Sequence, residues 1–155
     1  MTRDPGVDLR ACAANLLVQE ERPASDLDDV LRVVEGVRSS PLWERALAAK
    51  RRLVEVPFGL MVAREELGLS DGPEQTLLQG AIDLLFEEDG GWILVDYKSD
   101  TVTNNLPELV AFYAPQVALY RRYWERLTGA RARAGLFFLA TGQVVWPEDP
   151  RPVPR

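Results

Sequence analysis

The stretch GAIDLLFEEDGGWILVDYKSD, residues 80–100, decides the fold. It contains two apolar runs of strand character joined by DGG at residues 89–91, a strong signal for a short hairpin. The second run, residues 92–95, leads directly into Asp96 and Lys98. Because burying an unpaired charge is costly, charges at the end of a buried strand usually have partners or a task. The hairpin therefore points to a polar site at this end of the sheet.

The hairpin also predicts which side chains meet. Residues two apart on a strand share a face, so Asp96 and Lys98 project together while Tyr97 points to the other face. In a simple antiparallel register, Asp83 lies opposite Asp96, with Cβ atoms about 5 Å apart. Two carboxylates that close repel each other unless they share a proton or a cation. A divalent metal ion would relieve this repulsion, and so would a buried ion pair between Lys98 and one aspartate; spacing alone leaves both interpretations open.

The residue inventory limits the chemistry that such a site can use. The 155 residues include no histidine and a single cysteine, Cys12. These counts exclude an internal disulfide, a cysteine-ligated zinc site, a four-cysteine iron–sulfur cluster and a histidine-based triad within this sequence. The carboxylate and backbone oxygens that are left are hard ligands, which select Mg²⁺, Mn²⁺ or Ca²⁺.

Charge and hydropathy bear on partners and location. The net charge of −6 argues against a free-standing, tight nucleic-acid binder, because neutralising phosphates needs clustered Lys and Arg. No apolar stretch approaches the ~18 uncharged residues of a membrane span, and the first residues, MTRDPGVDLR, lack the apolar core of a signal peptide. We therefore expect a cytoplasmic protein without a membrane partner, and its 46% hydrophobic content is enough for a core.

The whole chain predicts an α/β fold in which helices pack on a mixed β-sheet. Residues 59–75, which carry Gly68, Gly72 and Pro73, are expected to form a long loop or broken hairpin. Three regions are predicted: an N-terminal helical segment at 1–38 whose start looks truncated, a core at 39–146, and a Pro-rich tail at 147–155. The expected helices lie in residues 1–23 and at 27–36, 41–50 and 106–127, and the expected strands at 53–58, 76–88, 92–98, 133–141 and 143–146.

Three motifs in this order are similar to a known family. GAID at 80–83, DYK at 96–98, and Gln116 with Tyr120 on the following helix resemble the RecB-like branch of the PD-(D/E)XK nuclease superfamily. The resemblance looks closest to the C-terminal nuclease domain of AddA-type helicase-nucleases, the C-terminal region of a UvrD/Rep-like helicase, because EVPF at 55–58 also has the look of that family. It covers roughly residues 40–146 and implies a restriction-endonuclease-like core of the order αβββαβ. The combined signal is fairly specific, whereas each motif alone is weak.

The resemblance implies a metal-dependent DNA nuclease. Asp83 and Asp96 would be ligands of Mg²⁺ or Mn²⁺, with the backbone carbonyl of Tyr97 as a further ligand and Lys98 as the catalytic lysine. Glu55 has a weaker claim, since a solvent-facing or salt-bridged glutamate is at least as well expected on its strand.

The helix motif is given a supporting role by the same resemblance. Gln116 and Tyr120 are four residues apart and share a helix face, from which they would pack over the metal site or touch the DNA backbone. For Tyr120 taken alone, packing of that face against the sheet is the better interpretation.

The resemblance also implies a substrate and protein partners. It implies DNA as substrate, a helicase motor in the same polypeptide or complex, a second AddB/RecC-like subunit, and a role in double-strand-break repair and recombination. The chain has no GxxxxGK[ST] loop, so a motor would lie elsewhere.

RecB-like nucleases normally carry a histidine on an upstream helix that completes the metal site, and this chain has none. It is then either a fragment of a longer polypeptide or a degenerate relative. The alternatives to a nuclease module are a non-catalytic DNA-binding or scaffold module of the same fold, and a stand-alone endonuclease.

Overall fold

The computed structural model describes residues 8–67, 72 and 74–147. The chain divides into two compact units, Met1–Glu44 and Arg45–Arg155. The predicted boundary between residues 38 and 39 stays a prediction. The predicted Pro-rich tail, apart from Pro147, and the start of the chain lie outside the described residues.

The first unit is helical, as predicted. It contains α1 (Leu9–Gln19), a short 3-10 turn, α2 (Leu27–Arg38) and the start of α3 (Pro41–Ala48). The side chain of Ser40 caps α3 by accepting a hydrogen bond from the backbone N–H of Trp43 at 3.2 Å. Pro41 takes the first helical position, where its missing N–H costs nothing.

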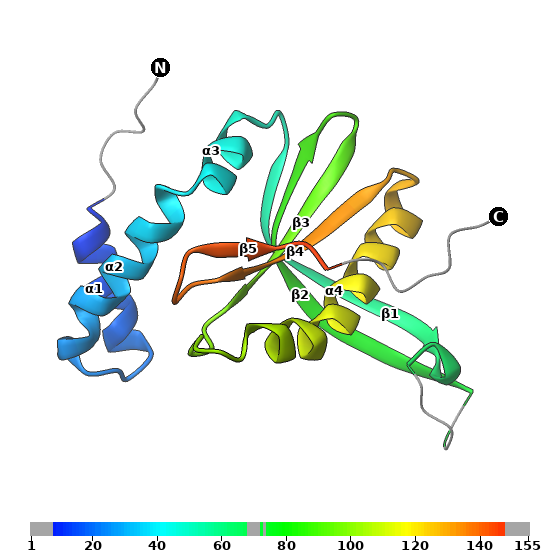
Figure 1. Cartoon of the computed structure of the whole chain (residues 1–155), viewed down its shortest axis with the longest axis horizontal. Helices are drawn as coiled ribbons and strands as arrows, with labels where there is room; N and C mark the ends of the chain where they lie inside the picture. The colour runs from blue at the N-terminus through cyan, green and yellow to red at the C-terminus, as the bar shows by residue number, and fades with distance from the viewer. Residues whose placement is uncertain (1–7, 68–71, 73, 148–155) are drawn as a thin grey trace. The chain divides into compact units, whose positions relative to one another are not determined.

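The second unit is built on a five-stranded mixed sheet with the order β1-β2-β3-β4-β5 (Figure 1). Its strands are β1 (Arg52–Ala63), β2 (Gln75–Glu88), β3 (Gly91–Lys98), β4 (Ala132–Phe138) and β5 (Gln143–Val145). Strands β3 and β4 are parallel because α4 (Leu106–Thr128) connects them, and the other neighbours are antiparallel. The predicted α/β fold with helices on a mixed sheet is confirmed.

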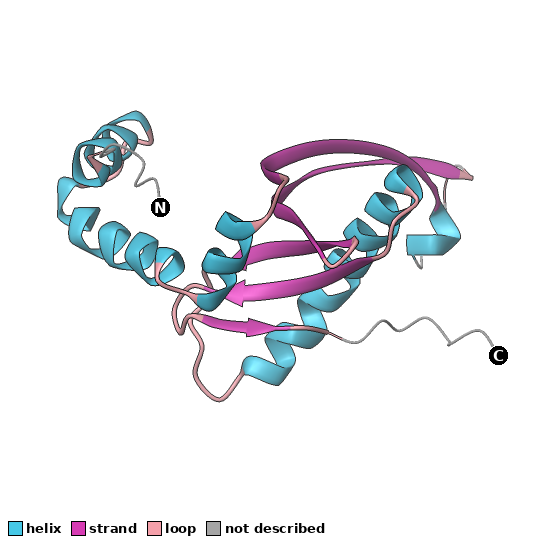
Figure 2. Cartoon of the chain, turned by 90° about the horizontal axis from the view of Figure 1, so that it is seen from above, coloured by secondary structure: helices cyan, strands magenta, loops and turns pink. Residues whose placement is uncertain are grey.

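The β1–β2 hairpin is longer than the sequence predicted. Residues 59–63 continue β1 and pair with residues 75–79 of β2, where we expected a loop. The residues that suggested a break cluster near 68–73, so the preceding LMVA segment is free to extend the strand. Figure 2 shows the two long strands arching away from the flatter part of the sheet. The loop alternative was therefore wrong for residues 59–63, whereas the hairpin alternative agrees with the β1–β2 pairing; Gly68 and Pro73 lie outside the described residues.

The main core lies between the sheet and α4. Trp92 of β3 meets Trp124 of α4 edge to face, with ring centroids 5.1 Å apart. Gly129 ends the helix in the left-handed conformation with φ 70°, which a C-terminal glycine adopts without strain. The buried residues of this cluster are Phe58, Ile82, Leu85, Trp92, Leu94, Val117, Tyr120, Trp124, Ala134, Leu136 and Phe138.

Gly80, the first residue of the GAID motif, leaves room for this core. A Cβ atom at Gly80 would lie 3.0 Å from two ring atoms of Phe58 and 3.1 Å from the Tyr120 hydroxyl. The Phe58 ring has little freedom to move, because it also packs against Tyr120 and Tyr123 at 4.8 and 5.0 Å between centroids. Any side chain at this position must therefore displace an aromatic cluster.

We expect Gly80→Ala to lower the free energy of unfolding by about 1–3 kcal/mol, the usual cost of overpacking a core. Urea denaturation followed by tryptophan fluorescence measures this change. Gly59→Ala is the matched control on β1, since its nearest neighbour would be a side-chain atom of Leu77 at an ordinary 3.8 Å. Equal stability of the two variants would contradict the packing argument.

Candidate active site

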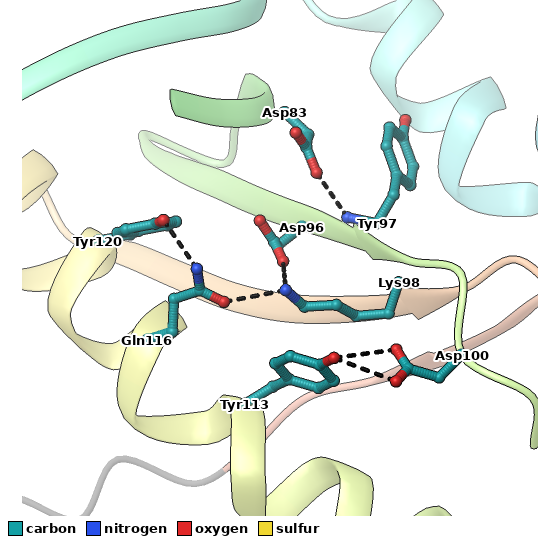
Figure 3. A network of polar contacts seen from close by, with 8 residues as sticks. All are labelled: Asp83, Asp96, Tyr97, Lys98, Asp100, Tyr113, Gln116 and Tyr120. Atoms are coloured by element: carbon teal, nitrogen blue, oxygen red, sulfur yellow. Dashed lines mark hydrogen bonds and ion pairs between the residues drawn. The ribbon is translucent and has the colours of Figure 1, made fainter. Parts of the chain in front are cut away.

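The β2–β3 hairpin brings Asp83 and Asp96 together. The observed register pairs Leu84 with Val95 and Leu85 with Leu94, as the sequence predicted, and the pairing ends there, with Asp83 and Asp96 as the next residues of the two strands. The Asp83 Oδ2 atom accepts a hydrogen bond from the backbone N–H of Tyr97 at 2.8 Å (Figure 3). A carboxylate thus takes the place of a backbone acceptor at the point where the ladder ends.

The environment of Asp83 disfavours its negative charge. Burial raises the pKa of Asp83 most, the N–H of Tyr97 opposes this, and the nearby Asp96 carboxylate raises the pKa further. The net direction is upward. The metal-free site therefore favours a proton or a cation beside Asp83.

This shift predicts that Asp83→Asn raises the melting temperature of the metal-free chain at pH 7. A carboxyl whose pKa is raised on folding stabilises the fold below its unfolded pKa, and this stability is lost as the pH rises through the folded pKa. Asparagine cannot ionise, and its carbonyl can still accept from Tyr97. Thermal denaturation in EDTA should show a higher melting temperature for Asp83→Asn than for the wild type at pH 7. This difference should vanish near pH ~3, where the aspartate is protonated and, like the asparagine, neutral. A lower melting temperature at pH 7 would contradict the proposed repulsion.

Lys98 lies between Asp96 and α4. Its Nζ atom forms an ion pair with Asp96 Oδ2 at 2.6 Å, and both side chains are almost buried, with exposed fractions of 13% and 7%. The same Nζ donates to Gln116 Oε1 at 2.9 Å. Gln116 Nε2 in turn donates to the Tyr120 hydroxyl at 2.9 Å. Figure 3 shows this continuous polar chain from β3 to α4.

Gln116 and Tyr120 share one face of α4, as predicted, but their surroundings differ. Tyr120 is 8% exposed and belongs to the apolar core, so it is placed to hold Gln116 rather than to meet a large ligand. Its pKa is raised, first by burial, although the bond from Gln116 opposes this. Gln116 stands between Tyr120 and the ammonium of Lys98.

Two further residues, which the sequence analysis did not single out, contact this row of polar side chains. The Tyr113 hydroxyl donates to the Asp100 carboxylate, with both Oδ atoms at 3.1 Å. The Tyr113 ring centroid lies 3.9 Å from Lys98 Nζ. A signal existed: Asp100 follows Lys98 by two residues, and Tyr113 precedes Gln116 by one helical turn.

Two other residues were predicted for the site, Tyr97 and Glu55; Tyr97 contacts Asp83 through its backbone N–H, and Glu55 lies between Val54 and Val56, which pair with Leu84 and Ile82. The Tyr97 side chain points to the other face, as predicted, where its ring meets Phe137 at 5.7 Å between centroids. Burial and then Asp83 raise the pKa of Tyr97 to about 12. Glu55 is exposed, and its φ of 50° departs from the extended backbone of β1. The structure does not assemble Glu55 with Asp83 and Asp96 into a three-carboxylate group.

The donors present suit a hard cation held by few protein ligands. Asp83 and Asp96 offer carboxylate oxygens, and Oδ2 of the buried Asp96 contacts Lys98 Nζ at 2.6 Å. The described residues contain no group of three or more His, Cys, Asp or Glu side chains placed to hold a metal ion. Mg²⁺ is commonly bound through one or two carboxylates with water and substrate oxygens completing its shell, and a pair of carboxylates is compatible with this arrangement.

The second unit is thus an α/β domain in which a helix packs on a mixed sheet. Its β2–β3 hairpin carries two neighbouring aspartates and a lysine. The profile of the PD-(D/E)XK nuclease superfamily matches residues 3–152. The chain belongs to this superfamily.

The chain is also homologous to a region of larger proteins. It is 40% identical over 131 residues to the AddA subunit of the ATP-dependent helicase/nuclease of Alkaliphilus oremlandii, covering 82% of this chain and 11% of that protein. The corresponding protein of Heliobacterium modesticaldum is 36% identical over 139 residues, covering 84% of this chain and 10% of that protein. That of Bacillus licheniformis is 29% identical over 147 residues, covering 88% and 12%. The chain thus spans about a tenth of the length of these relatives.

Among the helices in the described ranges, none combines the length and the apolar character needed to cross a bilayer.

Proposed function

We propose that this chain is a metal-dependent deoxyribonuclease module that hydrolyses phosphodiester bonds. The observation that carries the proposal is the convergence of Asp83, Asp96 and Lys98 at one end of the β2–β3 hairpin. Membership of a nuclease superfamily and likeness to part of a helicase/nuclease support it.

In this proposal Asp83, Asp96 and the carbonyl of Tyr97 hold Mg²⁺ or Mn²⁺. The bound cation supplies Lewis-acid catalysis and lowers the pKa of a water molecule. Lys98 presents its ammonium beside Asp96, where it offsets negative charge that develops on the phosphate in the transition state. Gln116 orients this ammonium through its amide oxygen and is itself fixed by Tyr120.

The proposed context is a helicase-nuclease of the RecB/AddA type that acts in double-strand-break repair and recombination in the cytoplasm. DNA is the substrate, the motor lies in the same polypeptide or complex, and a second AddB/RecC-like subunit is a partner. The net charge of −6 supports delivery of the strand by the motor, because an acidic domain binds DNA poorly by itself.

Cleavage of end-labelled linear single- and double-stranded DNA by the purified chain tests the function. We expect cutting with Mg²⁺ or Mn²⁺ and none in EDTA. A chain that binds Mn²⁺ and DNA but cuts neither substrate would contradict the proposal.

A second candidate is a catalytically degenerate DNA-binding or scaffold module of the same fold. The absence of any histidine in the sequence favours it, because the related nucleases complete their metal site with one. This candidate predicts DNA binding that Lys98→Ala leaves unchanged, together with no cleavage with either metal.

A further inference from the structure

We infer that Tyr113 and Asp100 form a positioning pair that holds the ammonium of Lys98 independently of Asp96. Lys98 Nζ has three neighbours of different chemistry: a carboxylate of Asp96 at 2.6 Å, an amide oxygen of Gln116 at 2.9 Å, and the ring centroid of Tyr113 at 3.9 Å. In Figure 3, Asp96 and the Tyr113 ring lie on different sides of the ammonium.

The ring distance is short enough for a strong interaction. A cation over an aromatic face is attracted by the ring quadrupole within about 6 Å of the centroid, and the attraction grows when water is excluded. Lys98 is only 13% exposed, so its ammonium is largely desolvated. The Tyr113 ring therefore contributes to holding it.

Asp100 strengthens and fixes this ring. The phenol of Tyr113 donates to both carboxylate oxygens of Asp100, which orients the ring and moves electron density into it. In keeping with this contact, the pKa of Tyr113 is raised, by desolvation first and then by the hydrogen bond to Asp100. The negative charge of Asp100 thus acts on Lys98 through the ring, without occupying its hydrogen-bonding sites.

This inference rests on the proposed nuclease function. In the proposed site, Tyr113 and Asp100 would compensate for the double role of Asp96. Asp96 is the partner of Lys98 and also a proposed metal ligand, so its charge would be shared between two cations. The Tyr113 ring and Gln116 provide attraction that is independent of Asp96. Without the ring, Gln116 would be the one described neighbour of the ammonium besides Asp96.

The position of Lys98 is measured first, without any reaction. NMR of the ¹³C-labelled, metal-free chain reports the Lys98 ε-methylene protons, assigned by their absence in Lys98→Ala. Protons above an aromatic face are shifted upfield by its ring current. We expect such a shift in the wild type, its retention in Tyr113→Phe and its loss in Tyr113→Leu.

The rates then separate the roles of ring and carboxylate. We expect Tyr113→Leu to lower kcat by roughly 3- to 30-fold, with unchanged KM for DNA and unchanged Mn²⁺ affinity. Tyr113→Phe and Asp100→Asn should each lower kcat only a few-fold. Their combination should lower kcat no further than Tyr113→Phe alone, since Asp100 acts on the ring through the phenol hydrogen bond that Tyr113→Phe removes. Tyr123→Phe, on the same helix, is the matched control and should have no effect.

The two proposals fail in different ways. Unshifted Lys98 protons in the wild type, or a Tyr113→Leu variant with wild-type kcat, would overturn the inference. Absence of cleavage by the wild type would count against the nuclease function, while the NMR shift would still decide whether the ring holds the lysine.

Discussion

Asp96→Asn is expected to slow metal-dependent DNA cleavage by at least about 10³-fold, because it removes a charged ligand of the proposed cation. Asparagine preserves the volume of this buried side chain, so the loss should not reflect unfolding. Initial rates on linear DNA with Mg²⁺, together with circular dichroism of the folded variant, measure the effect.

Asp89→Asn is the matched control for this variant. Asp89 lies in the turn of the same hairpin, is exposed, and has a φ of 52° that asparagine readily adopts. It undergoes the same chemical change without touching the site, so its rate should equal that of the wild type. Equal rates for Asp96→Asn and Asp89→Asn would remove Asp96 from the chemistry.

Lys98→Ala is expected to lower the rate by about 10²–10³-fold, the usual cost of removing one preorganised electrostatic group. In contrast to Asp96→Asn, it should bind Mn²⁺ at least as tightly as the wild type, since the competing ion pair with Asp96 is gone. Single-turnover rates at saturating Mn²⁺ separate loss of chemistry from loss of metal.

The only other lysine of the chain, the exposed Lys50, provides the control. Lys50→Ala should cut DNA at the wild-type rate. A Lys98→Ala variant that retained full activity at saturating metal would show that the ammonium is not catalytic, and would leave Lys98 as the buried partner of Asp96.

The sequence predicted the hairpin well because a short turn fixes its register. Once DGG at 89–91 is taken as the turn, the pairing of Leu84 with Val95 follows, and Asp83 and Asp96 are the next residues of the two strands. The predicted β1 was too short. The glycines and the proline near residue 70 indicated a loop, but residues 59–63 before them pair with β2.

Contacts between elements were harder to predict. The approach of Tyr113 to Lys98 depends on how α4 docks on the sheet, and helical spacing gives only the face on which Tyr113 lies. The two interpretations of Lys98 were a buried ion pair and a lysine beside a metal. The structure contains the ion pair with Asp96, and the metal remains a proposal.

The central claim is that Asp83 and Asp96 form one cation site, and Mn²⁺ titration followed by electron paramagnetic resonance tests it most directly. We predict saturable binding to the wild type that is lost in both Asp83→Ala and Asp96→Ala and retained in Asp89→Asn. Binding that survives both alanine substitutions would contradict the claim.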